Sequence, residues 1–177
     1  ASQMKLTLDH NVIIDLANRS PRVDKVRTAL EDGSHQGFIV EIGASEMRQR
    51  GIQPDRYDMF EELLREVGID SLPRLAPMMI WDVGFWDRGL WCDEQMENEA
   101  KAIETILFGD SPPIDIANEP EKFSVWLNRT CDVQTMWCHL HYKNDVFVTS
   151  DGNFHKATKV PRLLALGAKC ILRPEAR

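Results

Sequence analysis

The sequence predicts an α/β protein in which a central parallel sheet carries helices on both faces, a three-layer α/β/α sandwich. Two observations lead to this prediction. Patterns typical of strands alternate with patterns typical of helices along most of the chain, and this alternation implies parallel pairing. The 177 residues suffice for one sizeable core and are short for two, so we expect a single domain over residues 1–177.

The first half of the chain alternates in this way from its start. Residues 4–8 form an apolar run typical of a buried strand, and apolar residues then recur at helical spacing up to Asn18. Ser20-Pro21 is typical of a helix start, and Gly33 stands where that helix should end. The pattern continues with a strand at 37–42, helices at 44–50 and 54–68, and a third strand at 78–83.

Residues 84–120 fit the alternation less well, and we interpret them as a partly helical insertion within the domain. They contain a mostly acidic helix over 93–108 and the helix-breaking pair Pro112-Pro113. This helix has an apolar stripe that must pack against the rest of the protein, formed by Met96, Ala100, Ile103 and Leu107.

The last third of the chain returns to the regular pattern. One or two helices follow residue 120, and we expect the second to run from Asp132 to about Tyr142. A strand at 145–149, a short helix at 161–166 and a strand at 169–172 complete the chain.

Acidic residues stand at the positions where this arrangement would form a site. Sites in open parallel sheets lie outside the carboxyl ends of the strands, and Asp9 and Asp151 each follow a predicted strand. Glu46 falls on the helix after the second strand, where it competes with Glu41 inside the strand pattern. Asp132 is expected at the start of its helix. A single such residue is usually a helix cap, so the prediction of a site depends on the whole set.

The segments that carry these acids resemble the PIN domain family. They read "LDHNVIIDL" at 8–16, "SEMRQRG" at 45–51, "CDVQTMWCHL" at 131–140 and "DVFVTSDGNF" at 145–154. The resemblance implies a sheet in the order 3-2-1-4-5, which makes strands one and four neighbours. It also implies metal-dependent cleavage of RNA. Its departures are His10, where the family commonly has a small hydroxyl residue, and the insertion at 84–120.

Converging carboxylates predict a metal site. Several carboxylates at one edge stay ionised together only if a cation neutralises them, and oxygen ligands suit Mg²⁺ or Mn²⁺. Such an ion lowers the pKa of a bound water and orients a phosphate. The predicted ligands and catalytic residues are Asp9, Glu46, Asp132 and Asp151, with Asn11, Thr149 and Ser150 as residues that hold them in place.

A short basic stretch follows Asp151, and two interpretations of it stay open. Basic side chains of this kind usually form a solvated surface, but beside a phosphate-cleaving site they could hold the RNA backbone. The residues concerned are His155, Lys156, Lys159 and Arg162.

Three classes of function follow from the sequence. The first is a ribonuclease, either the toxin of a toxin–antitoxin pair or a stand-alone processing enzyme. The second is a catalytically silent PIN-fold module that binds a protein partner through the acidic insertion. The third, a phosphatase with Asp9 as nucleophile, needs a second acid where this chain has Asn11, so we discard it first. A zinc site at Cys138, His139 and His141 lacks a second ligand pair, and a packed helix is preferred.

Composition limits the partners and the compartment. The net charge of −7 argues against broad electrostatic coating of nucleic acid, although a carboxylate site is itself acidic before it binds metal. The chain has no apolar run of membrane-spanning length, no signal-peptide pattern, and four cysteines without paired spacing. We therefore expect a cytoplasmic protein that does not enter membranes. An antitoxin or other protein partner and a homodimer remain open alternatives.

Overall fold

The structure, a computed structural model, describes residues 3–40, 74–75, 94–112, 114–115 and 118–176 of the chain. The helices expected at 44–50 and 54–68, the strand expected at 78–83 and Glu46 all lie outside the described residues.

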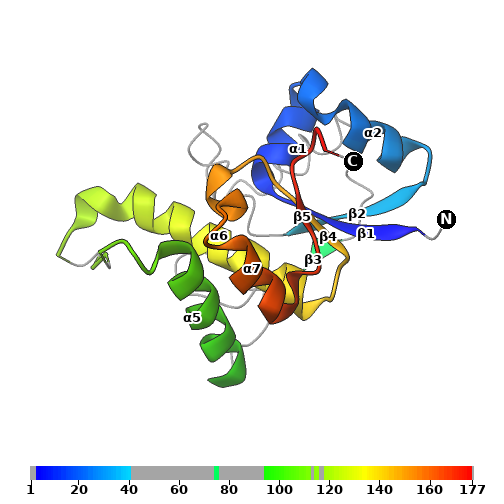
Figure 1. The fold of residues 1–177 in the computed structure, drawn as a ribbon. Helices are drawn as coiled ribbons and strands as arrows, with labels where there is room; N and C mark the ends of the chain where they lie inside the picture. The colour runs from blue at the N-terminus through cyan, green and yellow to red at the C-terminus, as the bar shows by residue number, and fades with distance from the viewer. Residues whose placement is uncertain (1–2, 41–73, 76–93, 113, 116–117, 177) are drawn as a thin grey trace.

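The centre of the protein is a parallel sheet in the order β3-β2-β1-β4-β5 (Figure 1). Its strands are β1 (Met4–Leu8), β2 (His35–Val40), β3 (Arg74–Leu75), β4 (Val146–Val148) and β5 (Ile171–Leu172). Every pairing within the sheet is parallel. The predicted parallel α/β class is confirmed, and β1 lies between β2 and β4, so the first and fourth strands are neighbours.

The strand beside β2 lies earlier in the chain than the sequence pattern predicts. It is the short segment Arg74–Leu75. The strand that the sequence predicts, at 78–83, lies outside the described residues. The Arg74–Leu75 segment stands between Pro73 and Pro77, and prolines this close together argue against a strand in the sequence.

Helices pack on both faces of the sheet (Figure 1). Helices α1 (His10–Ala17) and α2 (Asp24–Glu31) lie on one side. Helices α5 (Glu94–Phe108), α6 (Phe123–His141) and α7 (Val160–Leu163) lie on the other. The predicted helix start after α1 is present as a short 3-10 helix, Pro21–Val23, and α2 follows it directly. The Ser20 hydroxyl caps this turn by accepting a hydrogen bond from the Arg22 N–H. Gly33 has a φ of +75°, a conformation open to glycine, where the chain turns from α2 into β2.

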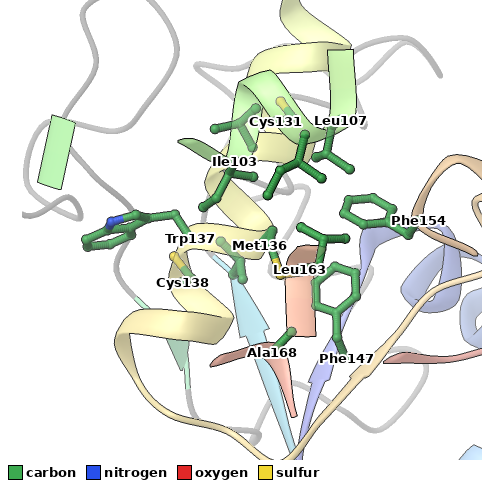
Figure 2. Packing of buried hydrophobic residues seen from close by; sticks show 13 residues of the cluster. Ile103, Leu107, Cys131, Met136, Trp137, Cys138, Phe147, Phe154, Leu163 and Ala168 are labelled. Carbon is green, nitrogen blue, oxygen red and sulfur yellow. The ribbon is translucent and has the colours of Figure 1, made fainter. Parts of the chain in front are cut away.

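Two hydrophobic clusters hold these layers together, one on each face of the sheet. On the α1 and α2 side, alternate residues of β1, β2 and β4 pack against apolar residues of the two helices, and the cluster contains Leu6, Leu8, Val12, Ile13, Leu16, Val23, Val26, Ile39, Val146 and Val148. On the other side, side chains from α5, α6 and α7 meet the sheet, as Figure 2 shows for Ile103, Leu107, Met136, Phe147, Phe154 and Leu163.

Helix α6 corrects one prediction that bears on the site. It is continuous from Phe123 to His141, so Asp132 lies in its middle and the expected helix start at Asp132 is wrong. The stretch from 121 to 131 contains neither Gly nor Pro, and nothing in it interrupts the helix. Helix α5 lies where the insertion was expected to be helical, and its predicted stripe faces the core, with Ile103 and Leu107 fully buried.

Among the described residues, no helix has both the length and the apolar character needed to cross a membrane. Cys131, Cys138 and Cys170 are reduced thiols, not disulfide-bonded. Burial raises the pKa of the Cys138 thiol well above its usual value, so this side chain acts as a small apolar group in the core.

Candidate functional site at the ends of β1 and β4

Asp9 stands where β1 passes into α1, and its backbone explains why an acid follows a buried strand. The Asp9 N–H still donates to the Val148 carbonyl of β4 at 3.0 Å, so the residue continues the sheet. Its side chain then accepts the His10 N–H at 2.8 Å and caps α1. The carboxylate is 2% exposed, and it is therefore a buried acid that needs internal donors.

The Thr149 hydroxyl supplies one of those donors and connects the ends of two strands. It donates to Asp9 Oδ2 at 2.7 Å and accepts the Asp151 N–H at 3.0 Å. The Asn11 amide donates to Asp9 Oδ2 and to Thr149 Oγ1, both at 3.2 Å, while Asn11 Oδ1 accepts the Ser150 N–H at 3.1 Å. The residues predicted to hold the acids in place thus form one network around Asp9.

Asp151 lies on the solvent side of this network. It follows β4 with an extended backbone, and its Oδ1 accepts the Asn153 N–H at 2.9 Å. This contact caps a short 3-10 helix, Gly152–His155. The side chain is half-buried, so the cap fixes its orientation without removing it from solvent.

Asp132 and Asp151 line one pocket, which we call the acid pocket. It has a volume of about 360 Å³ and is lined by Leu107, Phe108, Asp110, Ser111, Arg129, Asp132, Asp151, Asn153, Lys156 and Lys159. Helix α6 contributes Asp132 from its middle, while Asp110 comes from the turn after α5. The pocket therefore combines carboxylates with basic side chains at the carboxyl end of β4.

Lys159 lines this pocket with a side chain that is buried, not exposed. The side chain is only 6% exposed, and its ammonium donates to the Leu107 carbonyl and to Asn153 Oδ1. Burial lowers the pKa of Lys159, and the nearby charge of Lys156 lowers it further, while Asp110 and Asp151 act in the opposite direction. Because Leu107 is in the last turn of α5, Lys159 satisfies a carbonyl that the helix leaves without a partner.

The other predicted basic residues differ in their position relative to the acid pocket. The His155 ring Nε2 lies 2.8 Å from the Thr149 carbonyl, and because a carbonyl only accepts, Nε2 carries the proton. Lys156 is exposed and lines the acid pocket, whereas Arg162 is exposed and is not among the residues that line it. Of the predicted basic set, Lys156 is therefore the residue best placed to contact a phosphate.

The structure brings the predicted acids together in part. Asp132 and Asp151 share the acid pocket, but Asp9 is not among its lining residues and reaches Asp151 through Thr149. In the described part of the chain, no three His, Cys, Asp or Glu side chains are grouped so that they could hold a metal ion. Glu46 lies outside that part.

Four further polar residues of the acid pocket were not predicted: Asp110, Ser111, Arg129 and Asn153. Asp110 follows Gly109 at the end of an acidic helix, a position typical of a solvated turn. Arg129 lies on a helix, and the sequence does not show which side of that helix faces the pocket. Neither position carries a sequence signal, because what places these side chains in the pocket is the packing of α5 against α6.

Comparison of the chain with models of known protein families, with curated proteins and with solved structures finds no match in any of the three.

Proposed function

We propose that this chain is a PIN-like endoribonuclease that hydrolyses RNA phosphodiester bonds with Mg²⁺ or Mn²⁺ bound by carboxylates. One observation carries the proposal. The pairing of β1 with β4 brings Asp9 and Asp151 to neighbouring strand ends, joined through the Thr149 hydroxyl, and Asp132 lines the acid pocket together with Asp151. The position agrees with the rule that sites in parallel sheets form beyond the carboxyl ends of the strands.

The donor chemistry fits a hard cation. Asp132 and Asp151 offer carboxylate oxygens to one pocket, and oxygen ligands are those that Mg²⁺ and Mn²⁺ prefer. In the proposal these two side chains would hold the ion, and Asp9 and Glu46 would complete the set. A bound ion would activate a water molecule and stabilise the charge that develops on the scissile phosphate.

The chain's own residues would position the substrate and the acids. The Asn153 N–H holds the Asp151 carboxylate, and Thr149 holds the backbone at Asp151. Lys156 and Arg129 bring positive charge to the same pocket, where they would bind phosphate oxygens of the RNA backbone. This activity suits either the toxin of a toxin–antitoxin pair or a stand-alone processing enzyme.

A second function, a catalytically silent PIN-fold module, is favoured by the state of Asp9. Both oxygens of its buried carboxylate already accept hydrogen bonds from the protein, from the His10 N–H on one side and from Asn11 and Thr149 on the other. These bonds occupy most of the roughly four lone-pair sites of the carboxylate, which leaves little capacity for a metal ion. In such a module, Asp9 would cap α1 and tie β1 to β4, with no role in catalysis.

Cleavage of RNA separates the two functions. Purified protein is incubated with a panel of single-stranded and stem-loop RNAs in Mg²⁺, in Mn²⁺ and in chelator. The proposal expects cleavage that needs the metal and falls at least about 100-fold in Asp151→Asn, since removing one charged metal ligand removes stabilisation present in the transition state. Asn is also a good helix cap, so this variant keeps the Asn153 contact.

Asp15→Asn is the matched control, because Asp15 lies on α1 and is absent from the acid pocket. It should cleave like the parent. Full activity of Asp151→Asn would refute the assigned site, and an inactive parent across the panel in both metals would favour the silent module.

A further inference from the structure

A second and larger pocket opens between α5 and α6. Its volume is about 440 Å³, and its lining includes Ala100, Phe108, Trp126, Arg129, Thr130 and Val133. Phe108 and Trp126 are half-buried, so each presents part of an aromatic surface to it. Glu104 and Gln134 add polar groups to the same walls. We call it the interhelix pocket.

The interhelix pocket adjoins the acid pocket. Phe108, Ser111 and Arg129 line both of them. The Arg129 guanidinium lies over the Phe108 ring, 5.4 Å from its centroid, and donates to the Pro112 carbonyl at 3.1 Å. These two contacts fix Arg129 in the wall between the pockets. A ligand that occupies both pockets would therefore lie next to Arg129.

We propose that the interhelix pocket binds a nucleobase of the RNA, from a nucleotide next to the phosphate held in the acid pocket. This inference rests on the proposed function and extends it to substrate recognition. The volume lies within the roughly 300–1,000 Å³ of ordinary ligand pockets. The combination of aromatic faces, a basic side chain and an adjoining phosphate-binding site is that of proteins that bind single-stranded nucleic acid by stacking its bases.

The side chains that line the interhelix pocket favour a nucleobase over a purely apolar ligand. Glu104, Thr105 and Arg129 line the pocket beside its apolar residues, so its walls combine polar and apolar groups, as ligand pockets with oriented polar contacts do. A base offers an aromatic face to Phe108 and Trp126 and a polar edge to the remaining groups. Since stacking tolerates every base, recognition should depend on the presence of a base more than on its identity.

The test measures the contribution of the base without any cleavage. Binding of AMP, GMP, CMP and UMP is compared with binding of ribose 5-phosphate, by NMR titration in chelator. Both kinds of ligand carry the same phosphate and meet the same acids, so their difference isolates the base. Stacking of one base contributes about 1–3 kcal/mol, and the nucleotides should therefore bind about 5- to 150-fold more tightly.

Two variants that fill the interhelix pocket show whether the base binds there. Thr130→Phe places a ring in the pocket from α6, and Ala100→Phe does so from α5. In either variant the affinity for nucleotides should fall to that for ribose 5-phosphate. Val125→Phe is the matched control, since Val125 is 47% exposed on α6 and does not line the pocket. It should bind nucleotides like the parent.

The outcomes separate this inference from the proposed function. Equal affinity of the parent for nucleotides and ribose 5-phosphate would overturn the nucleobase pocket, even if RNA is cleaved. An unchanged preference for nucleotides in a folded Thr130→Phe or Ala100→Phe variant would overturn it as well. A preference that both filling variants abolish would support the pocket even in a protein that cleaves no RNA, and in that case only the catalytic proposal would fail.

Discussion

The Thr149 hydroxyl is a small group on which the geometry of the candidate site depends. It joins the Asp9 carboxylate to the Asp151 backbone and accepts a further bond from Asn11. The residue is fully buried, so no water is at hand to replace a lost bond. Loss of the hydroxyl would leave a buried carboxylate and a backbone N–H short of partners.

We therefore expect Thr149→Val, which keeps the shape and removes the hydroxyl, to lower the free energy of unfolding by about 1–3 kcal/mol. Thr149→Ser keeps the hydroxyl and should lose less than about 1.5 kcal/mol, through the missing methyl group. Urea unfolding of the two variants measures the difference. Equal losses in both would mean that packing, and not hydrogen bonding, explains the role of Thr149.

A second buried network surrounds His139 on α6. Its Nε2 lies 2.8 Å from the Ala168 carbonyl, which only accepts, so Nε2 carries the proton. Nδ1 then accepts from the Thr7 hydroxyl at 2.8 Å, and Thr7 in turn accepts from the Asn144 amide at 2.9 Å. The neutral ring is thus bonded at both nitrogens. Burial lowers the pKa of His139 below 6.5, and its bond to Ala168 only partly offsets this effect.

The direction of this pKa shift predicts how stability depends on pH. Between pH 6.5 and the lowered pKa, the unfolded chain binds a proton at His139 that the folded protein does not. Stability from this group is therefore complete above about pH 6.5 and is lost as the pH falls toward the lowered pKa, by at most about 1.4 kcal/mol per pH unit.

His139→Gln should be less stable than the parent at pH 8 but should lose less stability between pH 6.5 and 5. Urea unfolding at several pH values measures both slopes. Parallel slopes would show that His139 does not titrate in this range.

Much of the site could be predicted at the residue scale, for a physical reason. Asp9 and Asp151 interrupt apolar strands, and such an interruption is visible in sequence once the strands are recognised. The expected packed helix is also present, since Cys138 and His139 are fully buried on α6. Asp110 and Arg129 could not be predicted, since their place depends on the contact between two helices.

At the scale of elements, α5 is the feature that the sequence left most open. Its residues Ile103, Ile106 and Leu107 belong to the same hydrophobic cluster as Phe147 of β4 and Phe154. Figure 2 shows Ile103 and Leu107 on the helix that crosses above these rings. The helix therefore forms part of the core on this face, even though it lies within a segment that resembles an addition to the domain.

Truncation of one α5 side chain tests this role. Ile103 is fully buried, so Ile103→Ala should lower the free energy of unfolding by about 2–5 kcal/mol. Lys101→Ala removes an exposed side chain that pairs with Glu97 at 3.3 Å, and it should change stability by no more than about 0.5 kcal/mol. A similarly small effect of Ile103→Ala on urea unfolding would show that α5 is an accessory element.

Helices α1 and α5 could be predicted because their apolar residues have helical spacing. Helix α2 could be predicted from the start signal at Ser20-Pro21. The third strand could not, because Pro73 and Pro77 flank the segment that pairs with β2. The middle position of Asp132 on α6 could not be predicted either, because a polar residue inside an unbroken helix resembles a helix cap when only its neighbours are considered.

At the scale of the whole molecule, the fold brings charged side chains of both signs together in the acid pocket. The chain carries a net charge of −7, and part of this charge is gathered where α5, α6 and the end of β4 meet, at Asp110, Asp132 and Asp151. Arg129, Lys156 and Lys159 line the same pocket, so its three formal negative charges are matched by three positive ones. Asp132 and Asp151 still offer carboxylate oxygens to this pocket, and a cation that binds only the folded chain would stabilise it.

Titration of the metal-free protein with Mn²⁺ in a calorimeter tests this central claim most directly. The account predicts a saturable binding site in the parent protein and in Asp15→Asn, with affinity at least about 10-fold weaker in Asp151→Asn, because a single lost carboxylate ligand removes at least about 1.4 kcal/mol of binding energy. A parent protein that binds no Mn²⁺, or an Asp151→Asn variant that binds it as tightly as the parent, would contradict the account.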